Sequence, residues 1–481
     1  MSHQESPTKG REKTLRRIGS KGGEAMSGND PVYDSLVEIV GRDFVSNEPE
    51  DLYLYSRDLG AQPPRKVDYV VMPETVEQVQ KIVILANERK IPITPMGSGL
   101  TVSGLAVPVK GGIVLDMKRM DRIIEVNEKN KYAVVEAGVT QGALKSYLEK
   151  HYPHLQHSTP EAPPTATIAG NVLIHGHGHL TPSHGANSQM INGMEVVLPT
   201  GEICKIGSCS VSPYWFTRES LPDLAGLFIG WYGTTGIITK ISIQLFPKPM
   251  FRDLVVFLAE DPDVLPEMVF GVFQAELAEN FFVIAQDKPD WMFGHTYVVI
   301  ITTGYSKDEL ESKKATLRDM FDTRVKVVEQ IHPSLKERYL EVPPFAATQA
   351  DFAKGGGFEY NGCLLPMDRI PEAWRRGLEI ARKYDVAFSF GLQALDCGHS
   401  AMCGPVYSFN RADEESVKRV RKALDESSKL VLELGGLLWK AAVPGQRLMM
   451  HRMDPNTLEL MNRIRRLLDP NGIMNPGNWE E

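Results

Sequence analysis

Cysteine is scarce in this chain, with only five cysteines among 481 residues. A thin and odd-numbered set does not form the disulfide framework of a small secreted domain. We therefore expect a reducing, intracellular setting, in the cytoplasm. The five residues are Cys204, Cys209, Cys363, Cys397 and Cys403.

Long apolar runs are also missing. Runs such as residues 297–301 have the length of a strand and fall well short of the ~20 residues that cross a bilayer. Residues 1–30 are polar and basic and lack the apolar segment of a secretory signal, so we expect a disordered leader there. These features predict a soluble protein without a transmembrane segment.

The chain has no excess of basic residues, because 53 Lys and Arg stand against 61 Asp and Glu and give a formal net charge of −8. This balance argues against a nucleic-acid partner. Hydrophobic residues make up 42% and charged residues 24%, which excludes disordered and fibrous classes. At about 150 residues per domain, the length allows two or three domains.

From about residue 31 the sequence follows an α/β pattern. Apolar residues recur at helical spacing over 31–40, and a short buried strand is expected at 68–73. Thr75 and Gln78 have the spacing of a capping box, which predicts that a helix begins there. Further strands are expected at 91–95, 112–116, 123–126, 132–136, 191–198 and 236–245.

After Pro249 the pattern changes, because strand-like runs now alternate with long charged helices. This change predicts a second domain at about 250–440. A turn-rich run, 469–477, follows the last helix of the chain. The clearest elements of the second domain are strands at 254–258 and 297–302 and helices at 307–321 and 413–434.

The first glycine cluster directly follows the strand at 91–95 and contains Gly97, Gly99 and Gly104. Glycine permits positive φ and lets backbone N–H groups approach an anion closely. The cluster matches neither GxGxxG opening a helix nor GxxxxGK[ST]. Its sequence alone leaves a phosphate site and an ordinary turn as equal alternatives.

A second glycine cluster spans residues 168–180, where Gly170 and Gly176 could let main-chain amides wrap a diphosphate. A metal site is the competing interpretation, because three alternating histidines would share one strand face. The glycines between them make a loose scaffold and no carboxylate completes the site, so we expect no metal. The histidines are His175, His177 and His179.

Two charged residues could do chemistry beside a cofactor. Glu161 follows Pro160 in a proline-stiffened turn, where it is either solvated or a general base. Lys440 follows Trp439 and is either a surface residue or a buried positive charge.

Seven segments in this order resemble the FAD-dependent oxidoreductases of the vanillyl-alcohol oxidase and para-cresol methylhydroxylase (PCMH) family. The resemblance covers about residues 31–481. The matching segments are 73–79, 91–99, 112–116, 134–140, 193–202, 223–240 and 469–477.

The resemblance implies an α+β fold with three parts. A PCMH-type FAD-binding domain of two α/β subdomains would occupy 31–249, and an α+β cap with an antiparallel sheet would occupy 250–440. The segment 441–481 would return to the FAD-binding domain. The FAD-binding residues implied are Gly97, Ser98, Gly99, Leu100, Pro160, Gly170, Asn171, Gly176, Ile237 and Asn475.

The aromatic-alcohol branch of the family is the most similar. Its flavin-proximal carboxylate matches Glu161, and the pair beside its substrate matches Trp439 and Lys440. Some relatives attach FAD through a histidine near Leu100, and because leucine cannot form that bond we expect non-covalent FAD. The hydroxy-acid branch holds a metal with two motifs, of which His399 alone survives here, so we expect no metal-held acid.

The resemblance thus implies an FAD-dependent oxidoreductase that transfers a hydride to flavin N5 from an alcohol-type or para-alkylphenol-like substrate. The expected catalytic residues are Glu161, Lys440 and His399. The alternatives are a D-2-hydroxy-acid dehydrogenase of the lactate or glycolate type and an electron-relay flavoprotein subunit. We expect a small-molecule substrate and a separate electron acceptor: oxygen, a cytochrome, an iron–sulfur protein or a flavoprotein. We also expect a homodimer or a larger complex.

Overall fold

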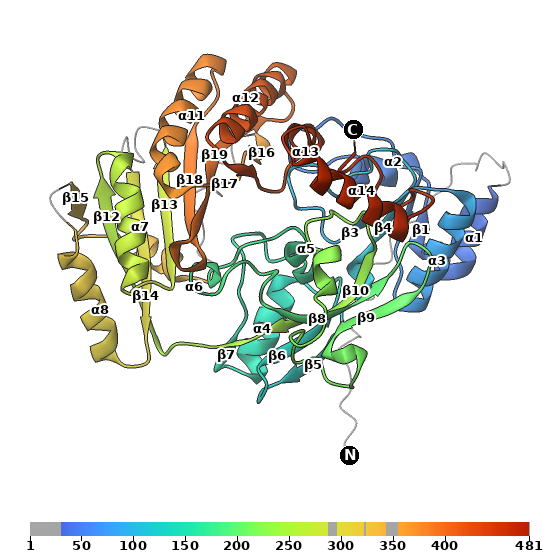
Figure 1. Cartoon of the computed structure of the whole chain (residues 1–481), viewed down its shortest axis with the longest axis horizontal. Coiled ribbons are helices and arrows are strands. Elements are labelled where there is room, and N and C mark those ends of the chain that lie inside the picture. The colour runs from blue at the N-terminus through green and yellow to red at the C-terminus, as the bar shows by residue number, and fades with distance from the viewer. Residues whose placement is uncertain (1–29, 287–295, 322–323, 343–354, 481) are drawn as a thin grey trace.

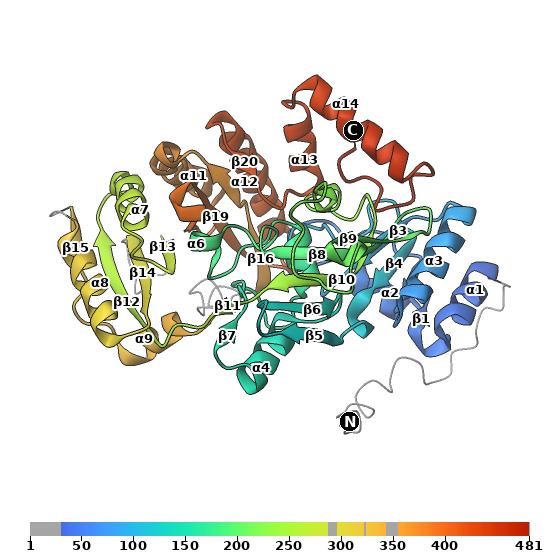
Figure 2. The same cartoon turned by 60° about the horizontal axis from the view of Figure 1, so that its bottom comes forward.

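The computed structural model describes residues 30–286, 296–321, 324–342 and 355–480 (Figure 1). All but the last residue of the leader expected at 1–30 therefore lies outside the described residues. For description we call residues 30–249 the N-terminal domain, residues 250–440 the cap domain and residues 441–480 the C-terminal segment. The two views agree that the cap lies to one side of the N-terminal domain (Figures 1 and 2).

The N-terminal domain begins with a four-stranded sheet in the order β1-β2-β4-β3. β4 pairs in parallel with β2 and with β3, as expected for strands joined through a helix. That helix, α3 (Val76–Arg89), begins at Thr75, whose side chain accepts from the backbone N–H of Gln78. The strands are β1 (Val45–Ser46), β2 (Tyr69–Val71), β3 (Ile93–Met96) and β4 (Ile113–Asp116).

A five-stranded antiparallel sheet follows, in the order β5-β6-β10-β8-β9. It shares one hydrophobic core with the first sheet, because Val79, Leu115, Val135 and Ile241 belong to a single buried cluster. The strands are β5 (Ile123–Asn127), β6 (Tyr132–Glu136), β8 (Ile191–Val197), β9 (Ile203–Gly207) and β10 (Ile237–Gln244). β7 (Leu155–Gln156) and β11 (Phe246–Pro247) form a separate pair.

The helices of this domain lie around the two sheets (Figure 1). Besides α3 they are α1 (Pro31–Val40), α2 (Pro49–Tyr55), α4 (Gln141–His151), α5 (Ile168–Leu173) and α6 (Thr181–His184).

The cap is built on a nine-stranded antiparallel sheet. Its path runs β15-β12-β14-β13-β18-β19-β17-β20, and β16 pairs with β19. The longer strands are β12 (Phe251–Ala259), β13 (Asn280–Gln286), β14 (Thr296–Gly304), β18 (Ser389–Leu395) and β19 (Ser400–Asn410). The shorter ones are β15 (Val325–Val327), β16 (Gly356–Tyr360), β17 (Cys363–Leu365) and β20 (Leu437–Leu438).

The two faces of the cap sheet have different neighbours. On one face, α7 (Leu265–Gln274), α11 (Ile370–Tyr384) and α12 (Glu414–Glu433) pack against strand residues in a single large core. On the other face, Phe282 packs with Tyr339 of α9 (Pro333–Leu340) in a small cluster. The β18–β19 part of this second face is turned toward the N-terminal domain. The cap domain also contains α8 (Lys307–Asp319).

The C-terminal segment contains α13 (Val443–Met450) and α14 (Pro455–Leu468) and then joins the N-terminal domain. Ile93 N–H donates to the carbonyl of Ile473, and Asn475 N–H donates to the carbonyl of Ile93, so the tail extends the edge of β3. Ile473 and Met474 are buried in the core of that domain. Among the residues that the structure describes, no helix is both long and apolar enough to cross a membrane.

Candidate active site

The loop after β3 packs tightly against the segment that begins α5. A Cβ atom on Gly97 would lie 2.2 Å from Oγ1 of Thr167, and one on Gly170 would lie 2.7 Å from the same atom. Thr167 Oγ1 in turn accepts from the N–H of Gly170 and caps α5. Gly99 has φ +69°, a conformation that favours glycine. The two glycine clusters therefore meet around one threonine.

Gly176 has a similar role in the second cluster. A Cβ atom there would lie 2.1 Å from Nδ2 of Asn171, so only glycine leaves room for this buried amide. Asn171 Oδ1 accepts from Nδ2 of Asn187 at 2.6 Å. These contacts hold the Asn171 side chain in place.

Small residues from these loops line an elongated cavity, which we call the glycine-loop cavity. Gly233, with φ +75°, belongs to it, and a Cβ atom there would lie 2.7 Å from Cγ of Pro95. The buried Oγ1 atom of Thr101 has no hydrogen-bond partner among the described residues. Closely approaching backbone, small side chains and an unpartnered hydroxyl fit a long, flat, phosphate-bearing cofactor such as FAD. Of the residues expected to bind FAD, those lining this cavity are Gly97, Ser98, Gly99, Leu100, Gly170, Asn171 and Ile237.

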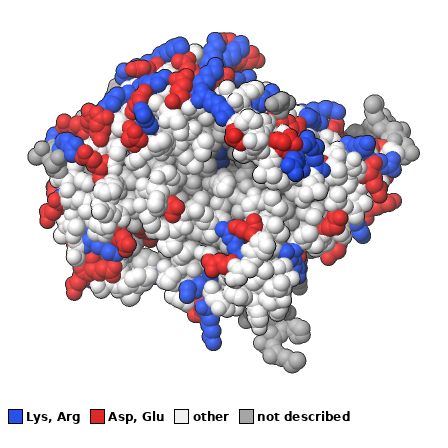
Figure 3. Space-filling model, viewed as in Figure 1, with Lys and Arg blue, Asp and Glu red and all other residues white. Residues whose placement is uncertain are grey.

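A second cavity of about 480 Å³ lies between these loops and the cap sheet, and we call it the cap cavity. It adjoins the glycine-loop cavity, because Leu100, Ala162, Asn171 and Lys440 line both. On the face in Figure 3, charged side chains gather mainly at the periphery, over α11 and α12, and few lie at the centre between the two domains. Most of the cap-cavity lining is likewise apolar.

Pro160 and Glu161 line the cap cavity. The Glu161 side chain is exposed to solvent in this cavity, while the surrounding protein atoms desolvate its carboxyl group enough to raise its pKa to about 7. A carboxyl group with this pKa can both take up and release a proton near neutral pH.

Lys440 reaches the same cavity from the end of the cap domain. Burial lowers the pKa of Lys440 to about 7, and its backbone has φ +52°. Its Nζ atom lies 3.8 Å from the ring centroid of Trp439, close enough for a cation–π contact when the amine is protonated. The structure thus brings together two residues that are distant in sequence.

Trp439, which contacts Lys440, itself contacts two further aromatic rings. The rings of His177 and Trp439 stack with centroids 4.4 Å apart and planes 3° apart, and the indole Nε1 donates to the carbonyl of His175 at 2.8 Å. Tyr360 of β16 also contacts the Trp439 ring. Burial, followed by the charge of Lys440, holds the pKa of His177 well below its usual range. His177 is therefore a neutral imidazole in the cap-cavity wall.

The three alternating histidines do not share a strand face, so that interpretation is wrong. They lie in the loop between α5 and α6, where His175 Nδ1 contacts Ser188 Oγ and His179 Nδ1 accepts from the N–H of Thr159. The three rings therefore have different neighbours. Within the described residues, no three His, Cys, Asp or Glu side chains are grouped to hold a metal.

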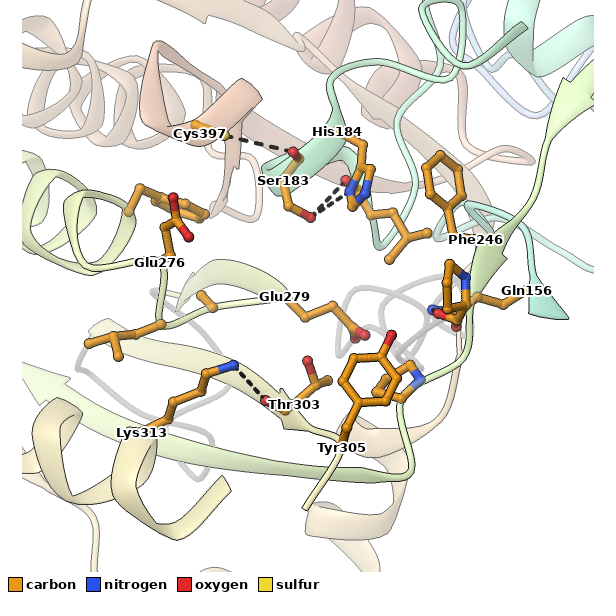
Figure 4. A pocket seen from close by; sticks show the side chains of 16 residues that line it. Gln156, Ser183, His184, Phe246, Glu276, Glu279, Thr303, Tyr305, Lys313 and Cys397 are labelled. Carbon is orange, nitrogen blue, oxygen red and sulfur yellow. Dashed lines mark hydrogen bonds between the residues drawn. The ribbon is translucent and has the colours of Figure 1, made fainter. Parts of the chain in front are cut away.

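His399 lies apart from Glu161 and Lys440. It is exposed after the turn 396–398 and lines neither cavity. Cys397, two positions earlier, lines a different pocket of about 410 Å³ between the α6 region and the cap. In Figure 4, Ser183 and His184 lie on one side of that pocket and Glu279 and Lys313 on another. None of the expected site residues lines it.

Asn475 lies in the tail and supports the site from behind. Its Nδ2 donates to the carbonyls of Tyr232, at 2.6 Å, and Leu105, at 3.3 Å, while its Oδ1 accepts from Oγ1 of Thr94. Neither Asn475 nor Gly176 lines the glycine-loop cavity or the cap cavity, but each contacts residues that do. The sequence did not identify three residues of this site: Thr167 between the glycine loops, and His177 and Tyr360 in the wall of the cap cavity. The only signal in the sequence was the presence of glycines near Thr167 and His177, which indicate close packing.

Two family models match the chain. "FAD binding domain" matches residues 67–207, and "FAD linked oxidases, C-terminal domain" matches residues 294–479. The first match contains both glycine loops, and the second contains Lys440 and Asn475.

Curated relatives and solved structures match over nearly the whole chain. "Glycolate oxidase subunit GlcD" of Bacillus subtilis (strain 168) is 25% identical over 93% of this chain and 96% of its own. "4-cresol dehydrogenase [hydroxylating] flavoprotein subunit" of Pseudomonas putida is 28% identical over 91% of this chain and 93% of its own. A crystal structure of p-cresol methylhydroxylase with substrate bound has a TM-score of 0.82 at 22% identity, covering 93% of this chain and 96% of that one. Both domain models, together with the glycine-loop cavity and this shared fold, show that the chain belongs to the PCMH-type FAD-linked oxidases and that FAD is its cofactor.

Proposed function

We propose that this FAD-linked oxidoreductase oxidises an alcohol or benzylic donor held in the cap cavity. The observation that carries the proposal is the presence of Glu161 and Lys440 in one largely apolar cavity that adjoins the FAD-binding loops. Bound FAD supplies the hydride acceptor, its N5 atom. His399 has no part in the proposal, because it is exposed outside both cavities.

Glu161 receives the proton that the donor hydroxyl must lose. With a pKa of about 7, its carboxylate is a base of suitable strength at neutral pH. Lys440 has the complementary role, because its protonated form stabilises negative charge that develops at the donor oxygen or the reduced ring. Phe282, Ile284 and Met402 of the apolar wall exclude water from the reacting groups.

A second candidate is the oxidation of a D-2-hydroxy acid, favoured by the resemblance to the subunit named for glycolate oxidase. In that case the cation of Lys440 would face the substrate carboxylate. The third alternative, an electron-relay subunit, requires no donor in the cap cavity.

Anaerobic flavin bleaching distinguishes these functions. FAD-loaded protein is mixed with 4-methoxybenzyl alcohol or with D-lactate, and absorbance near 450 nm is followed. We expect bleaching by the aromatic alcohol, slowed in Glu161→Gln. Bleaching by D-lactate alone would favour the hydroxy-acid function, and bleaching by neither, with dithionite still effective, would favour a relay subunit.

A further inference from the structure

The cavity-facing side of strand β18 lacks a side chain at its centre. Phe390 and Leu392 point into the core beneath α7, α11 and α12. Because side chains alternate along a strand, Gly391 and Gln393 lie on the opposite face. Gln393 Nε2 donates to the carbonyl of Gly178 in the N-terminal domain, at 3.2 Å, which confirms that this face meets the loops of that domain.

A second glycine lies directly beside the first. Gly391 pairs in register with Gly404 of β19, and on its other side it pairs with Ile284 of β13. All three residues line the cap cavity. Two adjacent strands thus lack side chains at the same level. The carbonyl of Asn361 fills the place beside Gly404, so the open gap lies over Gly391, and we call it the glycine trench.

The two positions are occupied by glycine for different structural reasons. Gly404 has φ +150°, and a Cβ atom there would lie 2.1 Å from the carbonyl oxygen of Asn361, so the local packing requires glycine. Gly391 has no such need, since a Cβ atom there would meet nothing within 4 Å and its φ lies outside the left-handed range. A glycine inside a strand weakens the strand. What Gly391 provides is therefore space in the cavity.

The surroundings of the trench are apolar. Phe282 and Ile284 border it on β13, and Met402 and Val406 flank Gly404 on β19. Gln393 is engaged with Gly178. The charged residues of the cavity, Glu161 and Lys440, lie outside the strands of the cap sheet. A group that reaches the trench meets backbone and hydrocarbon.

We propose that the glycine trench binds an uncharged alkyl or aryl group of the substrate, and that Gly391 sets how large this group can be. This inference rests on the proposed function, because it takes the cap cavity as the place where the donor binds. Burying one further methylene group tightens binding about three- to fourfold, so the trench favours donors with an extended apolar end.

Binding of unreactive probes tests the trench independently of turnover. FAD-loaded protein is titrated with 4-alkylbenzamides, from methyl to heptyl, and binding is read from the perturbation of flavin absorbance. Gly391→Leu fills the trench, Gly391→Ala fills it in part, and Gly226→Leu is the matched control. Gly226 is an exposed glycine outside both cavities at which a Cβ atom would also meet nothing within 4 Å.

In the wild-type protein, Kd should fall about three- to fourfold per methylene until the trench is full. Gly391→Leu should bind the shortest probe as wild type does and the longest at least tenfold more weakly. Gly391→Ala should show a smaller loss of affinity for the longest probe. This variant tests the trench if Gly391→Leu does not fold. Gly226→Leu should match wild type.

If Kd depends on chain length equally in Gly391→Leu and wild type, the proposed role of the trench is wrong. The same holds if no probe binds. The proposed function is judged separately by bleaching. If no alcohol reduces the flavin while the binding series depends on Gly391, the trench stands and the proposed donor chemistry fails. If alcohols reduce the flavin and the series ignores Gly391, only the trench fails.

Discussion

Glu161 and Lys440 line the same cavity, one from the N-terminal domain and one from the end of the cap, and burial moves the pKa of each to about 7. The carboxyl pKa is raised and the ammonium pKa is lowered, so both groups lose charge more readily than in water. Near pH 7 each can exist in either protonation state.

This relationship predicts a bell-shaped pH dependence of flavin reduction. The base Glu161 is ionised above pH 7 and Lys440 is protonated below it, so the apparent second-order rate constant should peak near pH 7. It should fall about tenfold per pH unit on each side. Stopped-flow reduction between pH 5 and 9 measures the profile, and a rate that is flat across this range would contradict it.

Glu161→Gln should slow flavin reduction by about 10²–10⁴-fold, because a positioned general base contributes about this much. The variant should keep its FAD and lose the acidic limb of the pH profile. Glu414→Gln, a change at an exposed position on α12, is the control and should behave as wild type. Wild-type rates in Glu161→Gln would remove this residue from the chemistry.

Lys440→Met should slow reduction and lower the flavin midpoint potential, because the anionic reduced flavin loses a nearby cation. Lys440→Arg, which keeps the charge, should restore much of the potential. Dye-equilibrated reductive titration measures it, with the exposed Lys418→Met as control. An unchanged potential in Lys440→Met would place the amine away from the ring.

The flavin should be released by acid precipitation and appear in the supernatant. Leu100 cannot form a bond to flavin, and His399 is exposed outside both cavities. The Cys403 thiol lies 3.8 Å from the thiol of Cys363, and the hydrogen bond between them, followed by burial, raises the pKa of Cys403. Flavin that stays with the precipitated protein would contradict this prediction and point to a covalent bond.

Gly97→Ala should impair FAD binding, because its methyl group would meet Thr167 Oγ1 at 2.2 Å and separate the two loops. The flavin-to-protein absorbance ratio after gel filtration measures the loss. Gly226→Ala adds the same methyl group where nothing lies within 4 Å and should retain full FAD. Full FAD in Gly97→Ala would show that the loops can separate without cost.

Glu359→Gln should stabilise the protein at alkaline pH. Glu359 is buried, its Oε2 accepts from the N–H of Ala61, and burial raises its pKa to about 8. As pH rises from about 4.5, the unfolded chain loses this proton before the folded protein does, so the wild-type free energy of unfolding declines until about pH 8. Glutamine keeps an acceptor and does not titrate.

The stability difference between Glu359→Gln and wild type should therefore grow from pH 5 to 8 and level off at about 3–5 kcal/mol. Urea unfolding at several pH values measures it. A constant difference across this range would assign the effect to altered packing.

Much of the fold follows from local sequence. Thr75 caps α3 at the predicted start, although the Gln78 side chain accepts from the N–H of Glu74 and not from that of Thr75. The strands expected at 112–116 and 132–136 are β4 and β6. The helix expected at 413–434 is α12, Glu414–Glu433. These elements were predictable because side-chain periodicity and capping act between near neighbours. The order of weak motifs also predicted the family and its FAD cofactor.

Contacts between distant segments decided the rest. Thr167 joins the two glycine loops, the three histidines face different neighbours, and Gly391 lies level with Gly404. No local pattern encodes these relations, since each depends on where another segment packs. The sequence by itself determined many of the elements and the family, and it named Glu161 and Lys440 as candidates. Only the tertiary structure placed both in one cavity and shifted their pKa values, because desolvation arises when two domains close around a side chain.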